Sequence, residues 1–105
     1  MSGQVEYLTY ELRQYLRITS DSFDGEITDL VNAALADLLD DGILPEKVND
    51  SSDHLIKRAV VSYVKAEFGN DNPDAEKHRA NYQSLKTHLM LSVDYAGAAE
   101  SDAEE

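Results

Sequence analysis

The sequence predicts an all-α fold, a small bundle of about four helices followed by an acidic, flexible C-terminal tail. The apolar residues between positions 26 and 41 recur at alternating steps of three and one, which is the period of one helical face and contains no strand-like alternation. The chain has only two prolines and five glycines, most of them near the ends of segments, where they terminate helices. Its 105 residues are the size of one domain. We therefore assign residues 1–95 to one helical domain and 96–105 to the tail.

The predicted helix over residues 26–41 is the element around which the others are expected to pack. Asp24, or alternatively Ser22, is the expected N-cap, because a short polar side chain accepts a hydrogen bond from the free N–H groups of the first turn. Gly42 follows the helix, where a left-handed residue without Cβ is favoured. One amphipathic helix cannot bury its own apolar stripe, so neighbours are required. The stripe consists of Ile27, Leu30, Val31, Ala34, Leu35, Leu38 and Leu39.

A shorter helix is expected before it, over residues 10–17. Thr9 is a plausible N-cap for this helix. Residues 1–8 are then a lead-in that is poorly ordered at its start. The side chains expected on the buried edge are Leu8, Leu12, Tyr15 and Leu16.

Two helices are expected after the central one. Pro45 excludes a continuous helix through the connection that follows Gly42. Ser51 or Ser52 is then expected to cap a helix that reaches residue 68, whose apolar arc is wider than one stripe and indicates a central position or a cover from another subunit. A last helix is predicted over residues 73–92, with a proline at its first position and Asn72 as its cap. Its expected inner face consists of Ala75, Tyr82, Leu85, Leu89 and Val93.

The charge is strongly negative and unevenly distributed. The formal net charge is −12 at pH 7. Residues 20–50 hold nine acidic residues and one basic residue, whereas residues 54–92 hold six basic and four acidic residues. An acidic half and a basic half favour subunits that meet head to tail. The excess of acid argues against sequence-tolerant binding to duplex DNA, which requires several cationic contacts to phosphate. An acidic surface that serves only solubility explains the same net charge.

No catalytic, cofactor or metal site is expected. Cysteine is absent, and the three histidines lack the spacing that would place two of them on one helical face. The loop over residues 70–76 has oxygen-bearing side chains at alternating positions, but the glycine and the terminal acid of a calcium loop are missing. No nucleophile elbow, phosphate-binding loop or dinucleotide fingerprint occurs. No segment approaches the length of a membrane span and no signal peptide is present, so a soluble chain that is made and used in a cytoplasm is expected.

The order of these segments resembles the small head–tail connector, or head-completion adaptor, proteins of tailed bacteriophages. The matching stretches are LTYELRQYLRIT, DGEITDLVNAALADLLDDGI, HLIKRAVVSYVKAEFGND and YQSLKTHLMLSVDY. The resemblance implies a structural, non-enzymatic all-α subunit of the virion, assembled in the host cytoplasm. It implies a homo-oligomeric ring, commonly of twelve subunits, that lies under the portal protein and extends the DNA channel toward the next head-completion or tail protein. DNA then passes through without specific binding, and the acidic tail orders only on docking.

The residues themselves offer two unlike surfaces for such a ring. A ring built head to tail needs two different and complementary patches on each subunit. The candidates on the acidic central helix are the aspartates Asp29, Asp37 and Asp40, together with Ala33 and Ala36, which permit close approach of a neighbouring subunit. The basic candidates on the two following helices are Lys57, Arg58, Lys65, Lys77, Arg79 and Lys86.

A small acidic inhibitor that mimics DNA is the alternative function. Such a protein needs carboxylates in two rows at roughly the spacing of phosphates, and a pull-down that recovers a nuclease or repressor would favour it. The basic residues between positions 54 and 92 speak against this alternative, because a mimic of DNA has little use for them.

Overall fold

The computed structural model describes residues 3–69 and 72–97. All regular structure in these residues is helical, which confirms the predicted all-α fold. Four longer helices correspond to the four predicted ones, and two single turns are added to them. The helices are α1 (Gly3–Tyr15), α2 (Asp24–Asp40), α3 (Pro45–Val48), α4 (His54–Glu67), α5 (Ala75–Met90) and α6 (Val93–Ala96).

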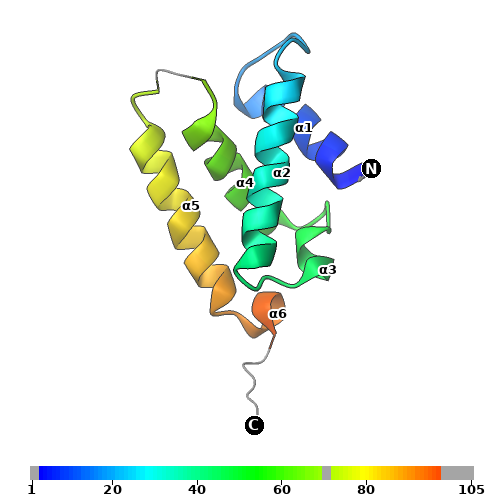
Figure 1. The fold of residues 1–105 in the computed structure, drawn as a ribbon, viewed down its shortest axis with the longest axis vertical. Coiled ribbons are helices and arrows are strands. Elements are labelled where there is room, and N and C mark those ends of the chain that lie inside the picture. The colour runs from blue at the N-terminus through cyan, green and yellow to red at the C-terminus, as the bar shows by residue number, and fades with distance from the viewer. Residues whose placement is uncertain (1–2, 70–71, 98–105) are drawn as a thin grey trace.

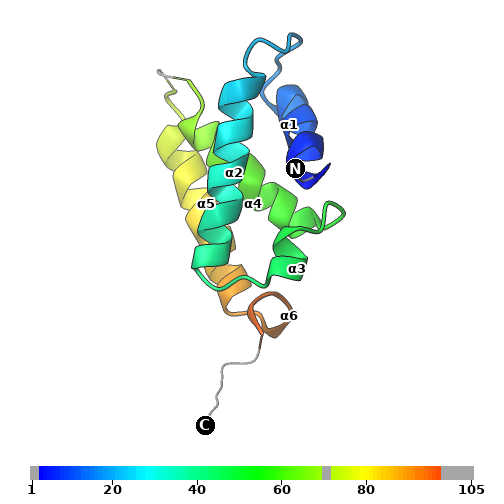
Figure 2. The same cartoon turned by 45° about the vertical axis from the view of Figure 1, so that its right-hand side comes forward.

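Helix α2 lies at the centre of the bundle (Figure 1). In this view α1 flanks it on one side and α5 on the other, while α4 passes behind it. The same order holds after a turn of 45° (Figure 2), so α2 and α4 are stacked on each other. The short helices α3 and α6 lie near the C-terminal end of α2.

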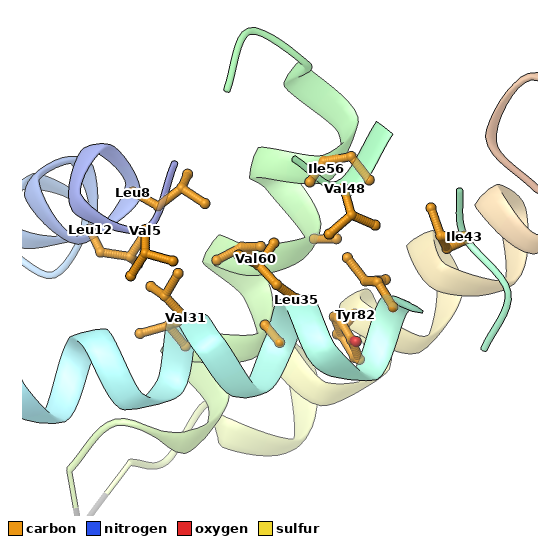
Figure 3. Close-up of a cluster of buried hydrophobic side chains, with 14 of the residues drawn as sticks. Val5, Leu8, Leu12, Val31, Leu35, Ile43, Val48, Ile56, Val60 and Tyr82 are labelled. Carbon is orange, nitrogen blue, oxygen red and sulfur yellow. The ribbon is translucent and has the colours of Figure 1, made fainter. Parts of the chain in front are cut away.

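The four longer helices enclose one apolar core, shown in Figure 3. The stripe predicted on α2 supplies its centre, since Ile27, Val31 and Leu38 are fully buried. The connection after α2 closes one end, because Ile43 and Val48 are buried as well. Burying each such side chain contributes about 1.5–3 kcal/mol relative to leaving it in water. The remaining core members are Val5, Leu8, Leu12, Ala34, Leu35, Ile56, Ala59, Val60, Val64, Tyr82 and Leu89.

The prediction for the first helix was wrong at its start. Helix α1 begins at Gly3, so Thr9 lies inside it, and the Thr9 hydroxyl lies 3.1 Å from the Thr28 hydroxyl of α2. Val5 and Leu8 continue the helical spacing of the buried face toward the N-terminus, and both are buried against the core. The helix therefore extends into the expected lead-in because its apolar stripe does. Tyr15, expected on the buried edge, is 44% exposed.

Both α1 and α2 end in the same hydrogen-bonded C-cap. After α2, the Ile43 N–H donates to the Leu38 carbonyl, and Gly42 adopts φ of 100° as predicted. After α1, the Ile18 N–H donates to the Arg13 carbonyl across Arg17. Arg17 has φ of 60°, a left-handed conformation that is uncommon for a residue with Cβ. The same C-cap therefore forms with a glycine after α2 and without one after α1. The sequence indicated only the end of α2, because a glycine signals this cap and an arginine does not.

The predicted N-caps of α2 and α4 were wrong. Asp24 lies inside α2, where its carboxylate forms two hydrogen bonds with Arg13 of α1, at 2.8 and 2.5 Å. Asp53 caps α4 by accepting hydrogen bonds from two backbone N–H groups of the first turn, both at 3.0 Å. Ser52 instead binds the Asp50 carboxylate in the preceding turn. Asp53, which directly precedes α4, is therefore the N-cap in place of the predicted Ser51 or Ser52.

Helix α5 also departs from its prediction. It begins at Ala75, with Asp74 at the N-cap position, while the Asn72 side chain accepts from the Asp74 N–H and donates to the Lys65 carbonyl. The helix ends at Met90, so Val93 falls outside it and is 68% exposed rather than on the inner face. Of the tail predicted over residues 96–105, only Ala96 and Gly97 are described, and Ala96 is the last residue of α6; positions 98–105 lie outside the described residues.

Candidate subunit interface

An exposed acidic face runs along α2. Asp29, Ala33, Ala36 and Asp40 follow one another at steps of four, three and four residues, so they form a single helical stripe, and all four are exposed. We call these four residues the acidic face. Within residues 3–69 and 72–97, neither Asp29 nor Asp40 forms an ion pair. Their charges are therefore not neutralised by the described part of the subunit.

Asp37 does not belong to the acidic face, although the sequence placed it there. Its carboxylate accepts a hydrogen bond from the Tyr82 hydroxyl at 2.5 Å and from the Lys86 ammonium at 2.9 Å. Lys86 also lies 2.6 Å from an oxygen of Asp41 and is only 8% exposed. Asp37, Asp41, Tyr82 and Lys86 form what we call the α2–α5 cluster. Two residues expected on unlike outer surfaces thus pair inside one subunit and join α2 to α5.

The position of Lys86 carried a signal in the sequence that the prediction did not use. Lys86 lies four residues after Tyr82 and three before Leu89, both buried, so the helical period places it on the inner face. A lysine there requires a carboxylate nearby, because an isolated buried ammonium is strongly destabilising. The sequence does not show which carboxylate pairs with Lys86, because Asp37 lies 49 residues away along the chain.

The cluster shifts the acid–base properties of its members. Burial acts to raise the pKa of Asp37, but the hydrogen bonds from Tyr82 and Lys86 together outweigh it and leave the pKa lowered. Burial acts to lower the pKa of Lys86, and its bonds to Asp41 and Asp37 outweigh that effect and leave the pKa raised. Burial followed by the bond to Asp37 raises the pKa of Tyr82. The carboxylate, ammonium and neutral phenol forms are therefore all stabilised near neutral pH.

Acid is expected to destabilise the fold partly through Asp37. A carboxyl with a lowered pKa in the folded state adds stability that is complete above the unfolded value, about 3.9, and is lost as pH falls below it. We expect the free energy of unfolding to be nearly constant between about pH 7 and 5 and to decrease below about pH 4. Thermal melts recorded by circular dichroism across this range measure the slope. Asp37→Asn should flatten it and the exposed control Asp29→Asn should not; equal slopes in both variants would contradict the assignment.

A basic groove lies between α4 and the C-terminal end of α1. Its volume is about 340 Å³, and it is lined by Tyr15, Lys57, Arg58, Val61, Ser62 and Lys65. We call these six residues the basic groove. The ammonium groups of Lys57 and Lys65 each lie 5.8 Å from the centre of the Tyr15 ring, within the range of a cation–π contact. Three of the six predicted basic candidates therefore gather around one exposed tyrosine.

The cations of the groove differ in how far they are neutralised. Lys57 lies 2.9 Å from the carboxylate of Glu11 in α1, and the hydrogen bond to this carboxylate raises the lysine pKa, with burial opposing it. In the part of the chain that is described, Arg58 and Lys65 form no ion pair with a carboxylate, and Arg58 is exposed. Arg58 and Lys65 are thus the groove residues with positive charge available to an external partner.

The remaining basic candidates lie on α5 and do not line the groove. Arg79 lies 3.0 Å from Glu67 and 2.7 Å from Glu76, so its charge is shared within the subunit. Lys77 is exposed and forms no ion pair within the described ranges. The sequence-based set of basic residues therefore divides into three in the groove, two at the start of α5 and one buried in the α2–α5 cluster.

Tyr15 is an interface candidate that the sequence analysis did not single out. It was expected in the core, but Tyr7, Glu11 and Tyr15 follow one another at steps of four and form a second stripe on α1, beside Lys57. Tyrosine is common in protein interfaces because it combines apolar area with a polar tip. The spacing of Tyr7, Glu11 and Tyr15 at steps of four is the feature of the sequence that could have predicted this exposed stripe.

The acidic face and the basic groove point away from each other. The buried side of α2 packs on the buried side of α4 (Figures 1 and 2), so the exposed sides of the two helices face opposite directions. Two surfaces on opposite sides of a subunit cannot pair with each other within one copy.

The described residues contain neither a metal-binding group nor a membrane span beside these surfaces. The described histidines, aspartates and glutamates form no group that could hold a metal ion. Asn70 and Asp71, in the loop with a faint calcium pattern, lie outside the described ranges. A membrane span would need a longer and more apolar helix than any described in this chain.

The fold and the two surfaces define a small all-helical protein suited to contacts with other proteins. Residues 10–96 match the family model described as phage connector protein, and the chain therefore belongs to the phage connector family. This confirms the resemblance that the sequence indicated, and it makes the chain a virion component that contacts other head or tail proteins of a phage. No curated protein and no solved structure matches the chain significantly.

Proposed function

We propose that the chain is the subunit of a head–tail connector ring. In this proposal the ring lies below the portal protein, extends the DNA channel toward the tail, and completes the head for tail attachment. Family membership supports the connector role. The observation that carries the ring is the placement of the acidic face and the basic groove on opposite sides of one subunit. Unlike surfaces so placed allow copies to join head to tail, and such a contact forms a ring when the rotation from copy to copy closes.

The role is structural rather than enzymatic. The net charge of −12 suits a wall along which DNA passes without being held, since exposed like charges repel within a Debye length of about 8–10 Å at physiological salt. The partners are further copies of the chain, the portal protein and the next head-completion or tail protein. Assembly takes place in the host cytoplasm before the subunit becomes part of the virion.

The basic groove also weighs against a DNA-mimic inhibitor. A mimic presents phosphate-like carboxylates to a nucleic-acid-binding protein, and three cations gathered around an exposed tyrosine would oppose that contact. The connector proposal uses both the acidic and the basic surface, whereas the mimic uses only the first.

Sedimentation velocity with and without the purified portal tests the proposal. We expect a ring-sized species whose fraction rises with protein concentration, or an assembly that forms on the portal and sediments with it. Raising the ionic strength from about 0.1 M to 1 M shortens the Debye length from about 10 to 3 Å and should weaken the assembly. A strict monomer at all concentrations that leaves the portal boundary unchanged would contradict the proposed function.

A further inference from the structure

We propose, building on the ring function above, that the basic groove of one subunit binds the acidic face of α2 from the next copy. The occupant of the groove is thus a helix of the same protein, presented by its exposed stripe of two aspartates and two alanines. Tyr15 lies at the centre of this contact, and Arg58 and Lys65 bind the aspartates.

Both surfaces carry charges that have no ion-pair partner among the described residues of their own subunit. Among the described residues, Asp37, Arg79 and Lys86 all have carboxylate or ammonium partners in their own subunit. Asp29 and Asp40 have none, nor do Arg58 and Lys65. Surface charges left without partners on two opposite faces are those that gain most from a complementary neighbour.

The basic side chains of the groove can span the length of the acidic stripe, although their positions on the helix are closer together. Asp29 and Asp40 are eleven residues apart on α2, or about 16 Å at a rise of about 1.5 Å per residue. Arg58 and Lys65 are seven residues apart on α4, or about 10 Å at the same rise. Long basic side chains extend beyond their own helical positions and reach outward along the axis. Both ends of the acidic stripe therefore lie within reach of a cation when the stripe is centred on the groove.

The middle of the contact is shaped for close approach. Between the two aspartates, the stripe carries only Ala33 and Ala36, so no large side chain holds the incoming helix away. Tyr15 lines the groove and is 44% exposed, with the ammonium groups of Lys57 and Lys65 beside its ring. A tyrosine packed against alanines and enclosed by charge pairs has the arrangement of an interface hot spot.

Complementary charge reversals test this contact. One variant, Asp29→Lys with Asp40→Lys, makes the α2 stripe basic, and a second, Arg58→Glu with Lys65→Glu, makes the groove acidic. Each variant alone brings like charges together at every contact, so we expect each to need at least a tenfold higher concentration to assemble than the unmodified chain. An equimolar mixture restores unlike charges at every contact between alternating copies and should regain assembly. Sedimentation alone and on the portal measures both results.

Matched controls separate this contact from a general effect of charge. Lys77→Glu reverses an exposed cation outside the groove, and Glu46→Lys with Asp94→Lys reverses two exposed acids outside the acidic face. Both controls should assemble as the unmodified chain does. Circular dichroism melts should show that all variants remain folded, because every substituted side chain lies at the surface or in the open groove.

The outcomes distinguish this inference from the ring proposal. If the unmodified chain assembles and both double variants assemble equally well, or if the mixture fails to recover, this contact is wrong while the ring stands. If the unmodified chain neither assembles nor binds the portal, the ring proposal itself fails. If the groove variant loses binding to a short DNA duplex that the unmodified chain binds, and assembly is unchanged, the groove is a phosphate site and the inference is overturned.

Discussion

Replacing Leu8 with alanine is expected to lower the free energy of unfolding by about 3 kcal/mol. Leu8 is 1% exposed and packs in the core between α1 and its neighbours, and truncating a buried leucine removes apolar contacts and leaves a cavity, at a cost of about 2–5 kcal/mol. For a domain of this size, the expected loss lowers the melting temperature by on the order of 15 °C. Thermal and urea unfolding followed by circular dichroism measure the change.

This substitution tests where α1 begins. A loosely attached lead-in over residues 1–8 would lose well under 1 kcal/mol, as surface substitutions do, whereas a docked helix from Gly3 onward loses several times more. Tyr10→Ala is the matched control, because Tyr10 lies on the same helix and is 55% exposed. Equal melting temperatures for the two variants would contradict the docking of the N-terminal half of α1.

Replacing Lys86 with alanine is expected to lower the free energy of unfolding by about 2 kcal/mol. Removing one partner of a fully buried ion pair typically costs about 3–5 kcal/mol. The effect is smaller here because the Asp37 and Asp41 side chains are 38% and 37% exposed, so water screens the carboxylates left behind. The expected fall in melting temperature is about 10 °C, measured as for Leu8.

Two further variants separate the charge of Lys86 from its packing. Lys86→Met keeps most of the buried stem and removes the ammonium, so it should recover part of the lost stability at neutral pH. Lys77→Ala removes an exposed lysine from the same helix and should change the free energy of unfolding by less than about 0.5 kcal/mol. If Lys86→Ala is as stable as Lys77→Ala, then the α2–α5 cluster does not hold these two helices together.

Helical periodicity was enough to predict the class of fold and most of the core. The C-cap at Gly42, the wide apolar arc of α4 and the apolar stripe of α2 were read correctly, because each depends on residues within a few positions of one another. The exception in the stripe is Leu39, which lies at its edge and is 40% exposed. Predictions failed where two local signals competed. Thr9 offered a cap while Val5 and Leu8 continued the stripe, and burial of the stripe decided the start of α1.

The candidate interface was predicted only as two groups of charges. The sequence by itself determined that one half of the chain is acidic and the other basic, since this follows from composition along the chain. Only the tertiary structure decided which charges remain at the surface. Asp37 and Lys86, 49 residues apart, pair within the subunit, while Arg58 and Lys65 line a groove together with Tyr15. The physical reason is that a helix's own residues set its period and its ends, whereas the partner of a charged side chain depends on which helices pack together.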